Sequence, residues 1–235
     1  MHIVFGCPVA ERAWVLPDWL KSIKSQEYSQ PTVVSIVCIY TESHDDTLKI
    51  LEDANVEIVH SSLPTRSFDR IRDHLWGSQN HEYEYMASLR NALRKEVLVR
   101  NADHFFSLDS DILLPNEHAV QDMIHEAAHE SYDAVAPLVD MEKNPGMSQP
   151  AYNFMRIDRH GVMGERFPLP AAPFLPFQAD VIMAAMLLNK KAQCVPWANH
   201  LQGEDIGWSL NARRMGIKVG VEPLVRCDHR MRIHG

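Results

Sequence analysis

Apolar residues follow two different spacings along the first part of the chain. Short continuous apolar runs are typical of buried strands, whereas apolar residues three or four positions apart are typical of helices with one buried face. The spacing of Leu16, Trp19, Leu20 and Ile23 is of the second kind. The patterns predict strands at 3–9, 33–40 and 56–61, a helix after the first strand, and a short helix from Asp46 to about Ala54.

The same two spacings continue through the rest of the chain. Helical spacing at 86–97 and at 120–127 flanks the expected strand HFFSLDSD at 104–111. The proline-rich segment 167–177 has too few amide donors for a helix or a central strand and is expected to be a surface loop. Residues 63–79, with Arg66, Arg70 and Arg72, are expected to form an extended loop. Further strands are predicted at 132–140, 152–158 and 218–223, and a helix from about Glu204 to Met215 that ends at Gly216.

Strands that alternate with helices favour a parallel sheet with helices on its faces. With 235 residues, of which 46% are hydrophobic, the chain is long enough to bury one substantial core. We therefore expect a single α/β domain.

The charge and the cysteines exclude some classes of protein. The chain has 31 acidic and 23 basic residues and a formal charge of −8, which argues against general nucleic-acid binding. Its four cysteines form no CxxC pair, so neither a disulfide framework nor a structural zinc site is expected. No apolar run approaches the ~20 residues of a membrane span, and no signal-peptide pattern follows Met1. A cytoplasmic protein without a membrane span is expected.

Two carboxylates follow the apolar residues of the HFFSLDSD segment. Because side chains alternate in an extended chain, Asp109 and Asp111 are expected to point to the same side. The carboxyl ends of strands in an open α/β sheet are where ligands bind. Paired carboxylates there suit Mg²⁺ or Mn²⁺, which share oxygen ligands with phosphates. The alternative is a polar strand end at which an aspartate caps the next helix.

A second acidic pair and a late histidine are further candidates. Glu204 and Asp205 open the predicted helix, where negative charge also has a purely structural role at the positive end of the helix dipole. His229 follows the last strand and is either a solvated polar group or a metal ligand.

The order of these pieces resembles the inverting GT-A glycosyltransferases of family 2 over nearly the whole chain. Four stretches carry the resemblance. They are CPVAERAWVLPDWLKSIKSQ with Pro8, Ser22 (or Ser25) and Gln26, LRNALRK with Arg90 and Asn91, DSD at 109–111, and GEDIGWSLNARRMGIKVGVEPLVRCDH.

The resemblance implies a single-domain GT-A, Rossmann-like α/β/α sandwich with a mostly parallel central sheet. Residues 1–111 would bind a nucleotide-diphosphate sugar, and residues 112–235 would bind the acceptor. The implied activity is transfer of a single sugar to a hydroxyl acceptor, since the Q-x-x-R-W motif of processive synthases is absent. Tyr40 and Thr41 stand where the family usually has two aspartates, so Glu42 is the candidate base-binding acid, and Asn211 replaces a common arginine.

The implied roles can be assigned residue by residue. Asp111 would coordinate Mn²⁺ or Mg²⁺ directly, Asp109 would contact the metal or the donor ribose, and His229 would contact the metal or the diphosphate. Arg12 and Arg90 would add positive charge near the phosphates. Asp205 would be the general base of an inverting reaction, with Glu204 orienting the acceptor. A retaining enzyme is the alternative, in which Asp205 only binds the acceptor.

Other protein classes compete with this interpretation. HEAAH at 125–129 matches the H-E-x-x-H signature of zinc peptidases, with His125 and His129 as ligands and Glu126 as base. However, helical spacing places these histidines on the polar face of the helix. A dehalogenase-type phosphatase would have its D-x-D near the N-terminus, and a sugar-nucleotide pyrophosphorylase would have a glycine-rich loop after the first strand. A non-catalytic glycan-binding module with this fold is also possible. Trp197 and Trp208 could stack on sugars or pack in the core.

Overall fold

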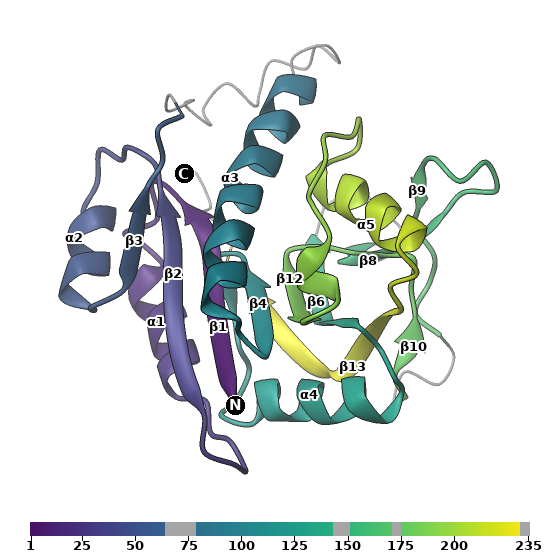
Figure 1. The fold of residues 1–235 in the computed structure, drawn as a ribbon, viewed down its shortest axis with the longest axis horizontal. Coiled ribbons are helices and arrows are strands. Elements are labelled where there is room, and N and C mark those ends of the chain that lie inside the picture. Colours follow the sequence, from purple (N-terminus) through teal and green to yellow (C-terminus); the bar gives the residue numbers. More distant parts are fainter. Residues whose placement is uncertain (64–78, 143–150, 171–174, 231–235) are drawn as a thin grey trace.

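A computed structural model describes residues 1–63, 79–142, 151–170 and 175–230. Its central element is a ten-stranded sheet with the order β10-β13-β6-β12-β4-β1-β2-β3, to which β5 and β7 are joined at β13 and β6 (Figure 1). The strands of this sheet are β1 His2–Val9, β2 Val33–Tyr40, β3 Glu57–His60, β4 His104–Leu108, β5 Ile112–Leu113, β6 Ala134–Glu142, β7 Ala151–Tyr152, β10 Phe177–Gln178, β12 Ala185–Asn189 and β13 Val219–His229.

Parallel pairing dominates the first half of the chain. β1 pairs in parallel with β2 and β4, and β2 pairs in parallel with β3. In the second half β12 runs antiparallel between β4 and β6, whereas β13 is parallel to β6. A separate three-stranded sheet contains β8 Phe154–Ile157, β9 Gly164–Glu165 and β11 Val181–Ile182. The expected mostly parallel sheet is therefore confirmed.

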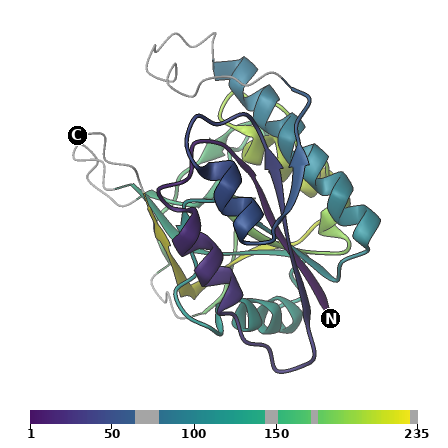
Figure 2. The ribbon, with the colours of Figure 1, turned by 90° about the vertical axis from the view of Figure 1, so that its left-hand side faces the viewer.

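Helices cover both faces of the sheet, as Figure 2 shows with α1 and α2 on one side of the strands and α3 on the other. One core joins the sheet to α1, α2 and α4, and a second core joins the opposite face to α3 and α5. The helices are α1 Leu16–Lys24, α2 Thr47–Asp53, α3 Gln79–Arg100, α4 Ala119–His129 and α5 Glu204–Arg214, with a short 3₁₀ helix at Ala192–Cys194. The α/β/α sandwich expected from the sequence is confirmed.

The first helix shows how the sequence produces an element. Pro17 at the helix start has a fixed φ and no amide hydrogen to leave unsatisfied, and Asp18 lies in the first turn, where it favours the helix dipole. Trp19 and Ile23, one turn apart, are 0% and 1% exposed and pack against the sheet. This burial fixes α1 on one face of the sheet.

Several expected elements need correction. The fourth strand ends at Leu108, so Asp109 and Asp111 do not belong to an extended segment. Strand β12 was not predicted, and the segment expected as one strand at 152–158 is interrupted between β7 and β8. The last strand continues past Pro223 to His229, because an irregularity between Glu222 and Arg226 absorbs the residue that cannot donate to the ladder. Arg66, Arg70 and Arg72 lie outside the described residues.

Candidate functional site

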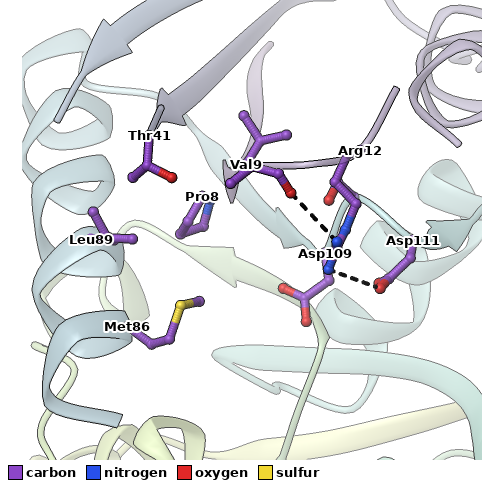
Figure 3. A pocket seen from close by; sticks show the side chains of 10 residues that line it. Pro8, Val9, Arg12, Thr41, Met86, Leu89, Asp109 and Asp111 are labelled. Carbon is purple, nitrogen blue, oxygen red and sulfur yellow. Dashed lines mark hydrogen bonds and ion pairs between the residues drawn. The ribbon is translucent and has the colours of Figure 1, made fainter. Parts of the chain in front are cut away.

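The two aspartates of the D-x-D sequence lie in a turn just beyond β4. The amide of Asp109 donates to the carbonyl of Ala184 at 2.8 Å, and the amide of Ile112 donates to the carbonyl of Asp109 at 2.9 Å. This turn, rather than strand alternation, directs both carboxylates toward one pocket at the carboxyl ends of β1 and β4 (Figure 3). Both aspartates line one pocket, as predicted, but they do so from a turn and not from an extended strand.

The pocket has one apolar wall and one polar wall. Figure 3 shows Met86 and Leu89 of α3 on one side, opposite Arg12 and Asp111. Its volume is about 100 Å³, smaller than the roughly 300–1,000 Å³ of typical small-molecule sites, so it can enclose only part of a nucleotide-sized ligand. The lining residues are Pro8, Val9, Ala10, Arg12, Thr41, Met86, Leu89, Asp109, Ser110 and Asp111.

Asp111 is a carboxylate in a crowded negative environment. Burial raises its pKa, and the neighbouring charge of Asp109 raises it further, whereas Arg12 and His229 oppose the shift. The Arg12 Nη2 atom lies 3.7 Å from Asp111 Oδ2, a partly exposed ion pair. A pair of close carboxylates with incomplete compensation favours binding of a cation.

His229 lies beside the D-x-D turn because β13 pairs with β5. His229 is the register partner of Ile112, the residue that follows Asp111. Its Nδ1 atom is buried and has no hydrogen-bond partner among the described residues. An unpartnered imidazole nitrogen on a side chain close enough to influence the Asp111 carboxylate has the donor chemistry of a Mn²⁺ ligand.

These three side chains do not form a closed cage. Within the described ranges, no three histidine, cysteine, aspartate or glutamate side chains are grouped closely enough to hold an ion by themselves. Mg²⁺ and Mn²⁺ sites that handle phosphates commonly use one or two carboxylates, and the phosphates supply the remaining oxygens. The donor set of Asp109, Asp111 and His229 therefore fits a cation that is shared with a phosphorylated ligand.

Arg90 connects the D-x-D turn to the start of α5. Its Nη2 donates to Asp109 Oδ1 at 2.8 Å, its Nε to Glu204 Oε1 at 3.0 Å, and its Nη1 to Ser107 Oγ at 3.1 Å. The side chain is 3% exposed. Burial disfavours its charge, but Asp109, Asp205 and Glu204 outweigh that effect and raise its pKa well above the usual value. Arg90 thus compensates the carboxylates of Asp109 and Glu204 from behind the pocket and does not itself line it; its place near the phosphates of a donor stays a prediction.

Asp205 is an acidic side chain of the site whose pKa is strongly raised. Its Oδ2 accepts from the amide of Ala184 at 3.2 Å, and its Oδ1 accepts from Trp197 Nε1 at 3.4 Å. Burial raises its pKa to about 7; Arg90 opposes the rise, and Glu204 and Asp109 add to it. A carboxylate with a pKa close to neutrality is suited to accept a proton at physiological pH.

The remaining predicted site residues lie in three different places. Pro8 lines the pocket. Glu42 is exposed after β2. Asn91 lies elsewhere, since its amide group donates to the Trp197 carbonyl at 2.8 Å and accepts from the Trp197 amide at 3.0 Å. Asn91 therefore fixes the chain that leads into α5 and does not reach the pocket.

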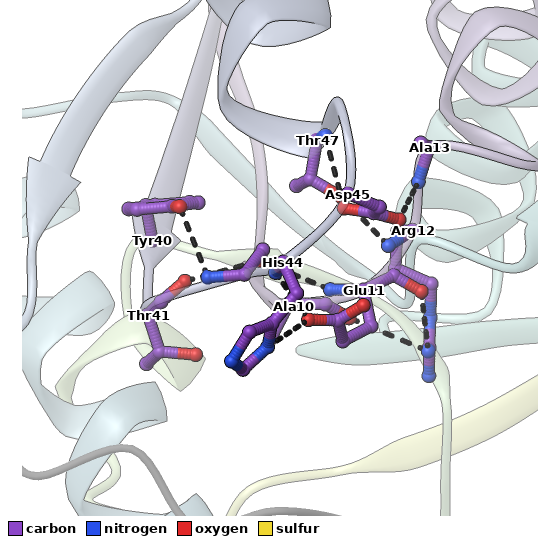
Figure 4. Close-up of polar contacts among 10 residues, drawn as sticks. Ala10, Glu11, Arg12, Ala13, Tyr40, Thr41, His44, Asp45 and Thr47 are labelled. Carbon is purple, nitrogen blue, oxygen red and sulfur yellow. Dashed lines mark hydrogen bonds and ion pairs between the residues drawn. The ribbon is translucent and has the colours of Figure 1, made fainter.

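The loops after β1 and β2 are joined by hydrogen bonds that the sequence analysis missed (Figure 4). Asp45 accepts from the amide of Ala13 at 2.9 Å and from the amide of Thr47 at 3.0 Å. Burial alone would raise its pKa, but the hydrogen bonds from Thr47 and Ala13 outweigh burial and lower it. Glu11, which has a left-handed backbone with φ 53°, accepts from the amide and ring of His44. These hydrogen bonds hold together the two loops that border the pocket. In the sequence, only the polar run TESHDDT indicated them.

The histidines of α4 face water, as their helical spacing predicted. The side chains of His125 and His129 are 72% and 70% exposed, and each ring lies near the glutamate that follows it. A peptidase zinc site lies in a cleft with a third ligand, and no such group is formed within the described part of the chain. The zinc-peptidase interpretation therefore has no structural support.

The two tryptophans expected near the acceptor side are buried. Trp197 is 3% exposed and Trp208 is 0% exposed, with their ring centroids 6.0 Å apart. They pack in the core between α3 and α5.

Among the described helices, none has the length and apolar character required to cross a bilayer.

Comparisons with known proteins agree with this architecture. Neither the family models nor the curated proteins produced a match to the chain. Among solved structures, S. aureus TarS 1-349 in complex with UDP-GlcNAc superposes with a TM-score of 0.62 at 14% identity, covering 100% of this chain and 60% of that one.

Two further structures have similar scores. The mannosyltransferase PcManGT from Pyrobaculum calidifontis, in complex with GDP-Man and Mn²⁺, gives a TM-score of 0.57 at 14% identity, with coverage of 99% and 58%. Glucosyl-3-phosphoglycerate synthase from Mycobacterium tuberculosis, with Mn²⁺, UDP and glucosyl-3-phosphoglycerate, gives 0.55 at 14% identity, with coverage of 98% and 72%. This chain spans 35% to 60% of the TarS chains that it matches. The chain has the fold of the GT-A glycosyltransferases.

Proposed function

We propose that this chain is a glycosyltransferase that moves a single sugar from a nucleotide-diphosphate donor to a hydroxyl acceptor, with the help of Mn²⁺ or Mg²⁺. The observation that carries the proposal is the convergence of Asp109 and Asp111 on one pocket, beside the unpartnered Nδ1 of His229. The structural neighbours were solved with UDP-GlcNAc, GDP-Man and Mn²⁺, which supports this class of donor.

In the proposed mechanism, residues of the 1–111 half hold the donor together with His229, which ends β13. Asp111, Asp109 and His229 would hold the cation, which supplies Lewis-acid stabilisation of the departing diphosphate. Arg12, at the polar wall of the pocket, is placed to pair with a phosphate oxygen. Thr41 and Pro8 would contact the donor at the opposite wall of the pocket. Glu42 is the proposed contact to the nucleotide base.

Residues of the 112–235 half act on the acceptor. Asp205 would remove the proton of the acceptor hydroxyl, because burial gives it a pKa of about 7. Glu204, paired with Arg90 at 3.0 Å, would orient the acceptor or its neighbour Asp205. The reaction would then invert the anomeric configuration. In a retaining reaction Asp205 would bind the acceptor without taking its proton, and the anomer of the product, read by NMR, separates the two outcomes.

The donor is identified by a thermal-shift panel. UDP-N-acetylglucosamine, UDP-glucose and GDP-mannose are added with and without Mn²⁺, since a ligand that binds only the folded state raises stability by RT ln(1 + [L]/Kd). We expect one donor to raise Tm by a few degrees and only in the presence of the cation. Absence of a cation-dependent shift with every nucleotide sugar would contradict the proposal.

A further inference from the structure

The segment that enters β12 contains a strained turn. It lies between the carboxylates of the D-x-D turn and those at the start of α5. Ala184 has a left-handed backbone with φ 64°, and the amide of Ala185 donates to the carbonyl of Met183 at 2.7 Å. A hydrogen bond between residues i and i+2 around a residue with positive φ defines a γ-turn of the rare, strained type. Ala184 itself is only 6% exposed.

The central residue of this turn contacts both halves of the proposed site through its backbone. The Ala184 amide donates to Asp205 Oδ2 at 3.2 Å, and the Ala184 carbonyl accepts from the Asp109 amide at 2.8 Å. One peptide segment therefore sets the distance between the proposed cation ligand and the proposed base. With an ordinary strand conformation at Ala184, its amide or its carbonyl would point elsewhere and lose its contact.

A buried asparagine holds the turn in its strained form. Asn153 is 0% exposed, and its Nδ2 atom donates to the carbonyl of Met183 at 3.2 Å and to the carbonyl of Pro137 at 3.0 Å. Its Oδ1 accepts from the Val139 amide at 2.9 Å, and its carbonyl accepts from the Met183 amide at 2.9 Å. These bonds anchor the first residue of the turn to β6. Strained backbone that the surroundings hold in this way is concentrated at functional sites.

We propose that Ala184 is a positioning residue for the transfer step, whose left-handed backbone orients Asp205 toward the acceptor relative to the D-x-D turn. This inference rests on the proposed function. Since neither contact uses the Ala184 side chain, a substitution acts through the backbone conformation that it permits. Residues that tolerate positive φ should preserve turnover, and residues that do not should reduce it.

The test compares Ala184→Thr with Ala184→Asn. The two side chains are similar in size, but Asn adopts the left-handed region readily and β-branched Thr does not. Turnover is measured with Mn²⁺ as release of UDP or GDP from UDP-N-acetylglucosamine, UDP-glucose and GDP-mannose, with water as the hydroxyl acceptor that takes the sugar. Affinity is measured as calorimetric binding of UDP or GDP with Mn²⁺. We expect the Thr variant to lose on the order of 100-fold in kcat, because small misplacements of a reacting group have effects of that size. The Asn variant should stay within about threefold of wild type, and both variants should bind the diphosphate within about threefold of wild type.

Equal kcat values in the two variants would overturn the proposal. So would a Thr variant whose kcat and diphosphate affinity fall in parallel, because the turn would then only support the fold.

A second measurement needs no turnover and no folded Thr variant. Hydrogen exchange of the Ala184 amide should be at least about tenfold faster in Asp205→Ala, whereas Asp205→Asn, which keeps an acceptor oxygen, should preserve protection. Unchanged exchange in Asp205→Ala would refute the contact. If wild type releases no diphosphate from any donor, the proposed function fails, while the exchange result still decides whether the turn holds Asp205.

Discussion

Removing the charge of Arg90 is the perturbation with the largest expected effect on stability. Arg90→Met keeps the length of the side chain but leaves Asp109, Glu204 and Asp205 without their shared cation. Breaking a buried ion pair from one side typically costs about 3–5 kcal/mol, and the 3% exposure of Arg90 leaves little solvent screening. For a chain of this length each 1 kcal/mol lowers Tm by roughly 2–4 °C, so a fall of about 6–20 °C is expected.

The loss of stability in Arg90→Met should depend on pH. Without the guanidinium, which opposes the rise, the pKa of the buried Asp205 carboxyl in the folded state increases further. A carboxyl with a raised pKa destabilises the fold as pH increases through that pKa, so the deficit of Arg90→Met should be larger at pH 8 than at pH 5.5. Urea unfolding at both pH values measures it.

A matched control lies one turn along the same helix. Arg94 donates to the Asn91 side chain and the Cys194 carbonyl and pairs with no carboxylate among the described contacts. Arg94→Met should cost no more than about 1 kcal/mol at either pH. The reasoning is refuted if Arg90→Met unfolds within 1 kcal/mol of wild type, or if its deficit is the same at the two pH values.

Three further variants test separate parts of the account. Burial raises the pKa of Glu222, whose Oε2 has no hydrogen-bond partner among the described residues, so stability is lost as pH rises through that raised pKa. Glu222→Gln should therefore raise Tm by a few degrees at pH 8, corresponding to about 1 kcal/mol, and by less at pH 4, as scanning calorimetry would reveal. In Gly207→Ala the new Cβ would meet the Ala198 carbonyl oxygen at 1.9 Å, and urea unfolding should show a loss of about 1–3 kcal/mol or more. His125→Ala combined with His129→Ala should change stability by less than about 0.5 kcal/mol and leave diphosphate release unchanged, because both rings are exposed.

The sequence was sufficient to predict elements with strong local patterns. Strand β2 at Val33–Tyr40 agrees with the predicted range, and the end of α5 follows from Gly216, whose φ of 65° suits glycine. The exposed histidine face of α4 was also predicted from helical spacing. These features depend on neighbouring residues, which a sequence displays directly.

Features that depend on distant residues were missed. β12 is a short apolar segment whose antiparallel place between β4 and β6 is set by tertiary pairing. The turn at Asp109 is held by Ala184, 75 positions later, so alternation could not describe it. The family resemblance singled out Arg90 as a positive charge near the phosphates, but its ion pair with Glu204 could not be predicted, because that pair depends on the packing of α3 beside α5.

The most direct test of the central claim is calorimetric binding of UDP and GDP to Asp111→Asn, with and without Mn²⁺. The control is Asp18→Asn, which removes an exposed carboxylate on α1 outside the pocket. We predict that wild type and Asp18→Asn bind one of the two diphosphates in the presence of Mn²⁺ only, and that Asp111→Asn loses at least about tenfold in affinity, or roughly 1.4 kcal/mol. Cation-dependent binding of equal affinity in Asp111→Asn and wild type would contradict the account.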